Sequence, residues 1–258
     1  MSLIKTAEQI HNIRQSGIYL NELLLKLKNA CKAGITLIEL EFIAEDYMKK
    51  NNIKWAFKRY QWFPANLCLS VNDCIVHGIP DDTVLQNWDL LKIDCGVNFK
   101  WGITDSAISI VIGGEYTNPL GQSLVKTTKA ALDLAIQELQ PGAPLINYGH
   151  TVSNRIHKDG FAIIEQLTGH GVGNKVHEDP HIYNYAHPAM KRVILQPGMV
   201  LAIEPITAVN STQFVAKKGN DWNLYCKHWD LWCQREYTIL ITHSGYEILS
   251  GITDPDRL

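Results

Sequence analysis

Five side chains of the kinds that bind metal ions are spread along the chain: Asp94, Asp105, His170, Glu204 and Glu236. Several of the carboxylates lie within apolar stretches typical of buried strands, such as the stretch 200–206 around Glu204. An ionised carboxylate is rarely buried without a partner, so strands of this kind that converge need a cation between them. Carboxylate and imidazole ligands without a thiolate suit hard to borderline divalent ions. The sequence therefore predicts a site for one or two divalent metal ions.

Asp94 and Asp105 are spaced as facing residues of a hairpin. A tight turn at Phe99 and Lys100 would place the two aspartates directly opposite each other, with Cβ atoms about 4.5–5.5 Å apart. Two ionised carboxylates at that separation repel each other unless a metal ion lies between them. The alternative is that Asp105 is an exposed turn residue beside Ser106.

Two histidines lie in the glycine-rich segment 168–180. Glycines flank His170, so the backbone can approach a ligand closely there. His177 follows seven residues later, a spacing that suits a loop returning over the same site. His77, in the segment 69–80, could by itself be a hydrogen-bonded turn residue. The remaining histidines that we considered lack such settings and are interpreted as surface or packing residues: His150, His157, His181, His187 and His228.

The elements that must position these residues form two similar blocks. Each block has two helical patterns followed by strand-like segments, and Thr6 with Gln9 and Thr36 with Glu39 resemble capping boxes at two helix starts. The predicted helices are 6–31, 36–50, 118–141 and 145–160, and the predicted strands are 67–71, 89–97, 107–112, 161–167, 200–209 and 236–241. No Ser/Gly-rich linker separates the blocks, so we expect one pseudo-duplicated domain over residues 1–258. The predicted class is α+β, with a mostly antiparallel sheet and helices on one side.

Composition excludes several functional classes. Charge is nearly balanced, with 24 Lys and Arg against 26 Asp and Glu, so no nucleic-acid or membrane-surface partner is indicated. The six cysteines show no CxxC spacing and are interpreted as reduced thiols. No signal peptide and no run of about 20 apolar residues is recognised. We therefore expect a cytoplasmic protein.

Five motifs occur in a set order along nearly the whole chain. They are Ser-Val-Asn at 70–72 with His-Gly-Ile-Pro at 77–80, Asp94 with Asp105, Gly-His-Gly-Val-Gly at 169–173 with His-Glu-Asp-Pro at 177–180, Pro-Gly-Met at 197–199 with Ile-Glu-Pro at 203–205, and Glu-Tyr-Thr at 236–238. Together they resemble the methionine aminopeptidases of the pita-bread fold. The spacing of the chain resembles the compact, bacterial-style type I branch, because no additional N-terminal domain precedes Asp94 and no helical insertion separates His177 from Glu204.

The resemblance implies a dinuclear metal centre. Asp105 and Glu236 would bridge two divalent ions, Asp94 would hold one ion, and His170 with Glu204 would hold the other. Mn, Fe, Co or Zn would all suit this mixture of oxygen and nitrogen ligands. A water activated by the metals would be the nucleophile.

The resemblance also assigns catalytic and substrate-binding roles. Glu204 would accept and pass on a proton, His177 would help hold the oxyanion, and His77 would bind near the scissile nitrogen. Four residues would form the pocket for a methionine side chain, with Phe57 beside them: Tyr60, Phe63, Cys68 and Trp222. The alternative is that these aromatic residues belong only to the core.

The chain departs from the family pattern at three positions near the predicted site. Val176 and Arg235 stand where an aromatic residue is usual, before the second histidine and before the last glutamate. Thr104 stands before Asp105 where glycine is usual. None of the three is a predicted ligand, so we expect catalysis to be retained, with Val176 and Arg235 loosening the pocket wall near the substrate side chain.

The implied function is removal of the N-terminal methionine from nascent polypeptides, preferably before a small second residue, by a monomer that could also dock at the ribosome. A related protein that has lost catalysis and serves as a binding module is one alternative. It predicts eroded ligands, whereas all five are present here. Another metallopeptidase of the same fold, such as a proline-specific one, is the second alternative.

Overall fold

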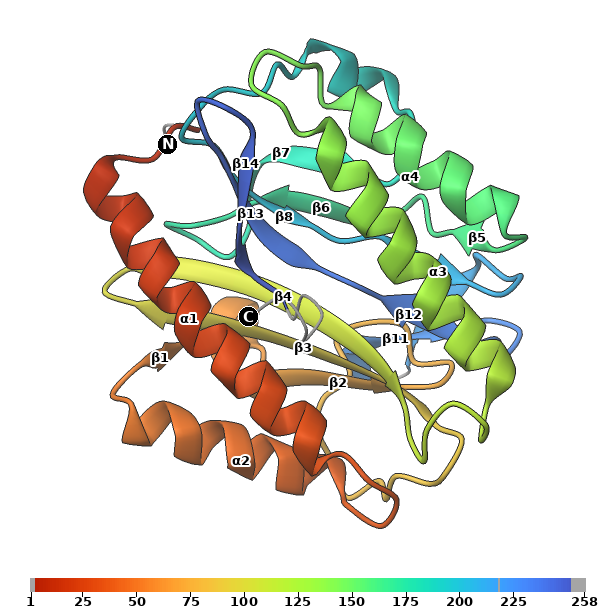
Figure 1. Ribbon diagram of the computed structural model, residues 1–258. Helices are drawn as coiled ribbons and strands as arrows, with labels where there is room; N and C mark the ends of the chain where they lie inside the picture. Colours follow the sequence, from red (N-terminus) through yellow and green to blue (C-terminus); the bar gives the residue numbers. More distant parts are fainter. Residues whose placement is uncertain (1–2, 218, 252–258) are drawn as a thin grey trace.

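The computed structural model describes residues 3–217 and 219–251, and its elements alternate in two halves (Figure 1). The first half begins with two helices, α1 (Ala7–Ala30) and α2 (Leu37–Lys50). Strands and a 3-10 turn follow: β1 (Lys54–Trp55), η1 (Tyr60–Trp62), β2 (Leu67–Val71), β3 (Leu90–Phe99) and β4 (Gly102–Val111). The strands form one antiparallel sheet in which β3 pairs with β1, β2 and β4.

The second half repeats the order of helices and then strands. Its helical elements are α3 (Pro119–Ala135), the 3-10 turn η2 (Ile136–Glu138) and α4 (Ile146–Lys158). The later elements are β5 (Ala162–Ile163), β6 (Thr168–Gly171), β7 (Glu178–Tyr183), η3 (Pro188–Arg192), β8 (Val200–Ile203), β9 (Ile206–Ala208), β10 (Phe214–Lys217), β11 (Asn220–Cys226), β12 (Trp232–Gln234), β13 (Tyr237–Ile241) and β14 (Tyr246–Ser250). They form antiparallel sheets of order β14-β13-β8-β6-β7, β12-β9-β5 and β10-β11.

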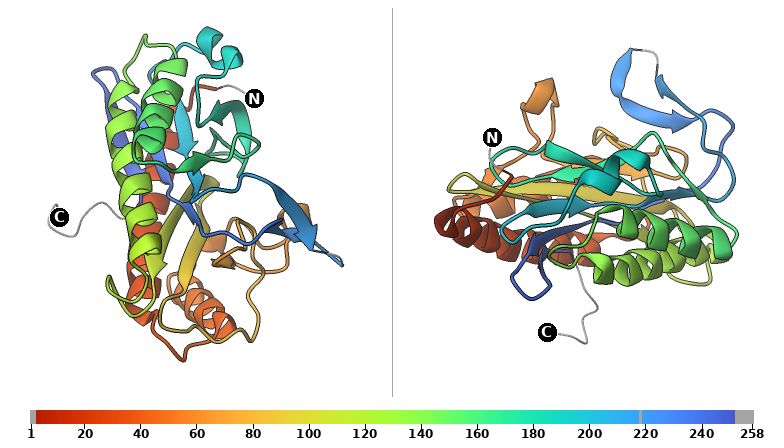
Figure 2. Two further views of the ribbon diagram at one scale, coloured as in Figure 1. Left: turned by 90° about the vertical axis from the view of Figure 1, so that its right-hand side faces the viewer. Right: turned by 90° about the horizontal axis from the view of Figure 1, so that it is seen from above.

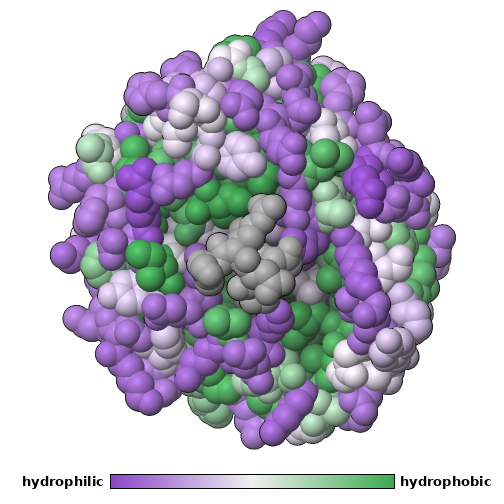
Figure 3. All heavy atoms as spheres, in the orientation of Figure 1, coloured by the Kyte–Doolittle hydropathy of each residue, from purple (hydrophilic) through white to green (hydrophobic). Residues whose placement is uncertain are grey.

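The helices lie on one side of the sheets, and the β10–β11 hairpin projects from the other side (Figure 2). One apolar cluster joins α3 and α4 to strands of the second half, and another joins α1 and α2 to β2, β3 and β4. On the face seen in Figure 3, hydrophilic residues dominate the outer region, and hydrophobic residues gather toward the middle. The predicted α+β class, with antiparallel strands and helices on one side, is confirmed.

The predicted capping boxes begin the first two helices. The Thr6 hydroxyl accepts a hydrogen bond from the Gln9 N–H, and the Gln9 side chain accepts one from the Thr6 N–H. Thr36 and Glu39 make the same reciprocal pair. An N-cap of this kind stabilises a helix by about 1 kcal/mol, so local chemistry accounts for both helix starts. No helix within residues 3–217 and 219–251 is long and apolar enough to cross a membrane.

Several predicted boundaries were wrong. The helix expected to reach Pro141 ends as an α-helix at Ala135 and continues only as the turn η2. The strand predicted over 200–209 is divided between two sheets, with the break at Glu204 and Pro205. Proline has no N–H for the ladder, so it favours a break at that point. The strand predicted over 161–167 is reduced to β5.

The predicted register of the β3–β4 hairpin was also wrong. The turn lies one residue later than expected, at Lys100 and Trp101, so Asp105 faces Gly96 rather than Asp94. Both turn residues have positive φ, 48° and 70°, as a two-residue type I′ turn requires. Because the resulting offset is two residues, the two aspartates still lie on one face of the sheet as diagonal neighbours.

Candidate active site

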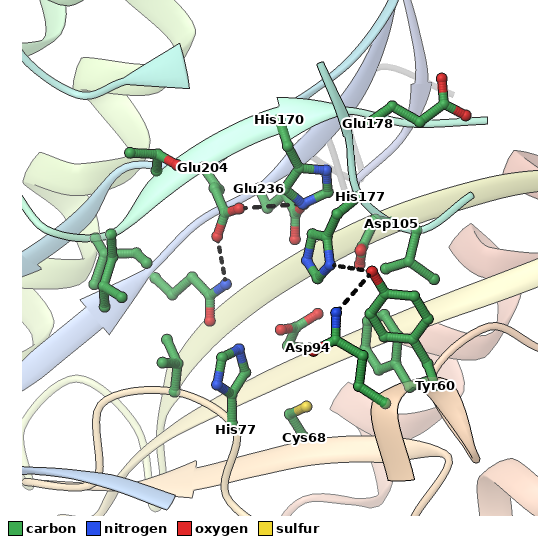
Figure 4. Close-up of a pocket in the computed structure, with 18 of the residues that line it drawn as sticks. Tyr60, Cys68, His77, Asp94, Asp105, His170, His177, Glu178, Glu204 and Glu236 are labelled. Atoms are coloured by element: carbon green, nitrogen blue, oxygen red, sulfur yellow. Dashed lines mark hydrogen bonds and ion pairs between the residues drawn. The ribbon is translucent and has the colours of Figure 1, made fainter. Parts of the chain in front are cut away.

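The structure brings the five predicted metal-type residues into one cluster between the two halves (Figure 4). β3 and β4 carry the two aspartates, β6 carries the histidine, and the glutamates lie next to the ends of β8 and β13. All five are buried, with at most 8% of any one exposed: Asp94, Asp105, His170, Glu204 and Glu236. Potential ligand atoms of Asp105, His170 and Glu236 lie within 4.8 Å of one another. His170 Nε2 lies 3.4 Å from Glu204 Oε1.

Hydrogen bonds between the halves fix the backbone that carries these ligands. The Thr238 hydroxyl donates to the Asp105 carbonyl oxygen over 2.7 Å and accepts from the Asp105 N–H over 2.9 Å. The Glu236 N–H donates to the Ala107 carbonyl over 2.9 Å. The ends of β4 and β13 are therefore joined beside the cluster, which sets the separation of the Asp105 and Glu236 carboxylates.

Burial raises the pKa values of all four carboxylates in the cluster. Burial raises the pKa of Asp94 to about 7. Burial, and then the charges of neighbouring carboxylates, raise the pKa values of Asp105, Glu204 and Glu236 well above their ordinary range. Within the described residues, Asp94 Oδ1, Asp105 Oδ1 and Glu236 Oε1 are buried without a hydrogen-bond partner. Buried carboxylate oxygens that no donor satisfies fit a divalent cation.

His170 presents a free ring nitrogen to the cluster. Its Nδ1 lies 2.9 Å from the carbonyl oxygen of Gly171, so Nδ1–H donates there and Nε2 stays unprotonated. Burial lowers the pKa of His170 to about 3, which keeps the ring neutral. A carbonyl that fixes the tautomer in this way is typical of metal-binding histidines.

His177 and His77 lie at the edge of the cluster. The rings of His177 and His170 are 4.3 Å apart between centroids, and His177 Nδ1 lies 3.0 Å from the Tyr60 hydroxyl. The His77 ring stands edge-on to Trp222 at 5.9 Å. Burial lowers the pKa of both histidines, that of His77 to about 4. Both are therefore neutral near pH 7 and can each donate one hydrogen bond.

A cavity of about 610 Å³ opens onto this cluster. All four predicted pocket residues line it: Tyr60, Phe63, Cys68 and Trp222. Phe63 and Trp222 meet edge to face at 5.2 Å, and Cys68 pairs with Asp94 across β2 and β3. Val176 lines the same cavity and is 3% exposed. The apolar wall and the carboxylate cluster thus share one space.

The expectation that Arg235 loosens the pocket wall was wrong. Its guanidinium lies over the Tyr237 ring, 5.5 Å from the centroid, and Arg235 does not line the cavity. Successive residues of an extended chain point to opposite faces, so Glu236 points into the site while Arg235 and Tyr237 point toward α3. Thr104 likewise points away from the site, and its hydroxyl donates a hydrogen bond to the hydroxyl of Ser16 in α1.

Sequence reasoning missed three residues of the site. Gln234 donates from Nε2 to Glu204 Oε2 over 3.1 Å, and Thr238 holds the backbone of Asp105. Both are two residues from Glu236, so alternation along an extended strand was the signal that could have found them. His181, interpreted as a surface or packing residue, lines the mouth of the cavity. No sequence pattern places it there.

The Asp94 carboxyl is expected to contribute less to the stability of the metal-free protein as the pH rises from about 4 to about 7. The folded-state pKa of Asp94 is raised from 3.8 to about 7. A raised carboxyl pKa favours the fold below the unfolded pKa, and this contribution is lost as the pH rises through the folded pKa. Urea unfolding of the wild type and of Asp94→Asn in chelator at several pH values separates this contribution from the opposite one of the histidines, whose pKa values are lowered. A difference in the free energy of unfolding between the two proteins that stays constant or increases in favour of the wild type across this interval would contradict the prediction.

The chain is similar to several known proteins. Residues 11–243 match the model of Metallopeptidase family M24. A methionine aminopeptidase of Mycoplasma capricolum is 37% identical over 251 residues, covering 97% of this chain and 98% of that protein. The crystal structure of a methionine aminopeptidase from Thermotoga maritima has a TM-score of 0.92 at 32% identity, over 96% of this chain and 99% of that one. Prolidase from Pyrococcus furiosus has a TM-score of 0.78 at 23% identity, over 98% of this chain and 66% of that one.

These likenesses agree with the geometry of the site. The predicted pita-bread fold is confirmed, because the methionine aminopeptidase and the prolidase share this chain's architecture. A family of metallopeptidases implies divalent metal ions, and the buried ligands supply the oxygen and nitrogen atoms that such ions need. The chain is a member of metallopeptidase family M24.

Proposed function

We propose that this protein removes the N-terminal methionine from polypeptides. One observation carries the proposal: a buried cluster of four carboxylates and a histidine lies against an apolar cavity of about 610 Å³ in a member of a metallopeptidase family. The similarity to methionine aminopeptidases along nearly their whole length supports the same substrate. The two halves both contribute ligands and cavity walls, which favours treating the chain as one catalytic domain.

The residues present fit two divalent ions, of Mn, Fe, Co or Zn. Asp105 and Glu236 would bridge them, Asp94 would hold one, and His170 with Glu204 would hold the other. Ions held there would supply Lewis-acid chemistry, the activation of water and the polarisation of the scissile carbonyl. The unpartnered oxygens of Asp94, Asp105 and Glu236 support this assignment.

Glu204 is the proposed proton carrier. Burial raises its pKa, and Gln234 holds Oε2 while Oε1 faces His170. A carboxylate placed among the ligands can take a proton from the attacking water and return it to the departing amine. His177 would donate a hydrogen bond to the developing oxyanion, and His77 would bind near the scissile nitrogen.

The apolar wall is the proposed binding site for the methionine side chain. Phe63 and Trp222 supply aromatic faces and edges, and Cys68 with Tyr60 completes the wall next to the carboxylates. Contacts between a thioether and aromatic rings are favourable, so such a pocket suits methionine. A small second residue is expected to be preferred beside His77 and His177, which line the cavity next to the cluster.

Val176→Phe is expected to increase the preference for methionine over leucine at the cleaved position. Val176 lies in the cavity wall with Phe57, Phe63 and Cys68, so a larger side chain would fill space beside the substrate. A mismatch of methylene size changes transition-state binding by about 1–3 kcal/mol. The ratio of kcat/KM for Met-Ala-Ser and Leu-Ala-Ser measures the effect, with Val215→Phe on exposed β10 as the control. An unchanged ratio would remove Val176 from the pocket.

A panel of peptides tests the substrate class. Met-Ala-Ser and Met-Gly-Ser should be cleaved with added Mn or Co, and the dipeptides Ala-Pro and Gly-Pro serve as controls for a proline-specific activity. Cleavage of the proline controls alone would favour the proline-specific alternative, and no cleavage of any peptide would favour a binding module. All five ligands are present, which argues against the latter.

Nascent polypeptide N-termini are the proposed substrates in the cell, which would place the protein in the cytoplasm, with the ribosome as a possible docking partner. From the resemblance to the family we expect a monomer. Light scattering on the purified protein tests that expectation.

A further inference from the structure

A buried ion pair lies next to the site, outside the ligand cluster. Lys5 Nζ pairs with the Glu178 carboxylate, and the two side chains are only 1% and 8% exposed. Figure 4 shows Glu178 pointing away from the ligands while His177, its neighbour in sequence, points toward them. Lys5 lies before residue 11, where the family match begins. A buried charge pair is costly to form, so its position beside His177 calls for an explanation.

Glu178 closes the loop that carries His177. Its Oε1 accepts hydrogen bonds from the backbone N–H groups of Asn174 and Lys175, over 2.7 and 2.8 Å. Lys5 occupies Oε2. Both carboxylate oxygens therefore have donors, and the loop between β6 and β7 is tied to the residue that follows His177.

Lys5 reaches this loop from a segment that is itself anchored. The Lys5 N–H donates to the Gly198 carbonyl over 2.9 Å, and Ile4 forms a bridge with Met199 just before β8. The stem of Lys5 lies directly under the loop, since a Cβ on Gly173 would come 2.8 Å from Lys5 Cε. Gly173 has a φ of +136°, a conformation that other residues rarely adopt.

The loop is also tied to the hairpin that carries Asp105. The Ile103 N–H donates to the Gly173 carbonyl over 2.7 Å. The Gln9 side chain donates to Asn174 Oδ1 over 3.0 Å. The start of β4, the first turn of α1 and the segment around Lys5 thus converge on one loop. In the described residues, the only charge pair among these contacts is Lys5 with Glu178.

We infer that Lys5, through its ion pair with Glu178, is a positioning residue for His177, an inference that rests on the role proposed above for His177. The ammonium holds the carboxylate, the carboxylate holds the loop, and the loop sets where the His177 ring stands relative to His170 and Tyr60. Loss of the ion pair leaves the Glu178 carboxylate without Lys5, so the loop that carries His177 is held less firmly. It leaves all five metal-type ligands in place.

The test is a double-mutant cycle on the metal-loaded enzyme with Met-Ala-Ser as substrate. Lys5→Met is expected to lower kcat by about 10–100-fold, since a displacement of about 1 Å can cost about 10² in rate. Metal content and KM should not change, and Lys5→Arg should restore most of the loss. Arg14→Met is the matched control, because it breaks a pair between α1 and β14 whose side chains are 44% and 39% exposed.

The His177→Ala background decides whether Lys5 acts through His177. Lys5→Met should lower kcat no further there, because contributions that pass through one residue are not additive. The same fold loss in both backgrounds, or a wild-type kcat in Lys5→Met, would overturn the inference alone. A wild-type kcat in His177→Ala would overturn the role of His177 and the inference with it.

A second variant protects the test against misfolding. Glu178→Gln removes the charge but keeps an oxygen that can accept from Asn174 and Lys175. If Lys5→Met does not fold, as judged by circular dichroism, the same cycle is carried out with Glu178→Gln. A wild-type kcat in Glu178→Gln, or the same fold loss of kcat in the wild-type and His177→Ala backgrounds, would then overturn the inference.

Discussion

Asp105→Asn and Glu236→Gln are each expected to remove nearly all hydrolysis while the fold survives. Both residues are buried, at 3% and 1% exposed, and each has a carboxylate oxygen without a donor. Removing one ligand is expected to weaken the stabilisation of charge in the transition state by several kcal/mol. A loss of about 4 kcal/mol lowers kcat about 10³-fold. Release of methionine from Met-Ala-Ser, measured together with metal content, gives the result.

The same two variants should make the metal-free protein more stable. Neighbouring carboxylates raise each other's pKa, so neutralising one removes a repulsion. Glu41→Gln is the matched control, because Glu41 is also buried but accepts hydrogen bonds from Asn66 and Leu67. It should lower the melting temperature and leave metal content unchanged. Near-wild-type methionine release by Asp105→Asn or Glu236→Gln would rule out their proposed roles as ligands.

His177→Ala is expected to lower kcat by about 10²–10³, the usual contribution of an oxyanion donor, and to leave the metal content unchanged. The ring lies 4.3 Å from that of His170, and its Nδ1 faces the Tyr60 hydroxyl, so Nε2 is free to face the substrate. Steady-state kinetics on Met-Ala-Ser and metal analysis measure the two quantities. His11→Ala, on the exposed face of α1, is the control.

Two outcomes would contradict that assignment. A collapse of metal content in His177→Ala would make His177 a ligand. An unchanged kcat with unchanged metal would remove it from the reaction. Tyr60→Phe extends the test, because it removes the partner of Nδ1 and should cause a smaller loss than His177→Ala.

The residues that the structure gathers into the cluster could be predicted, because their surroundings in sequence are distinctive. A carboxylate within an apolar stretch is costly unless a cation compensates it, and this argument alone singles out Glu204 and Glu236. The helix starts at Thr6 and Thr36 could be predicted equally well, because a capping box is complete within four residues. Both predictions depend only on residues that are close together in the sequence.

The register of the hairpin, the side to which Arg235 points and the contacts between distant segments could not be predicted. The hairpin register depended on whether the turn used Phe99 with Lys100 or Lys100 with Trp101, and no Asn-Gly pair marked the choice. Arg235 was misplaced because family resemblance gives a position and not the face to which a side chain points. The bond from His177 to Tyr60 joins loops far apart in sequence, and only the folded structure brings them together.

Metal dependence of methionine release tests the central claim most directly. The purified protein is treated with chelator, dialysed, and assayed for free methionine from Met-Ala-Ser before and after stepwise addition of Mn, Fe, Co or Zn. The proposed function predicts no release after chelation and recovery that saturates as the metal is added, with Ala-Pro-Ser left uncleaved. Full methionine release in the continued presence of chelator, or no release with any of the four candidate metals, would contradict it.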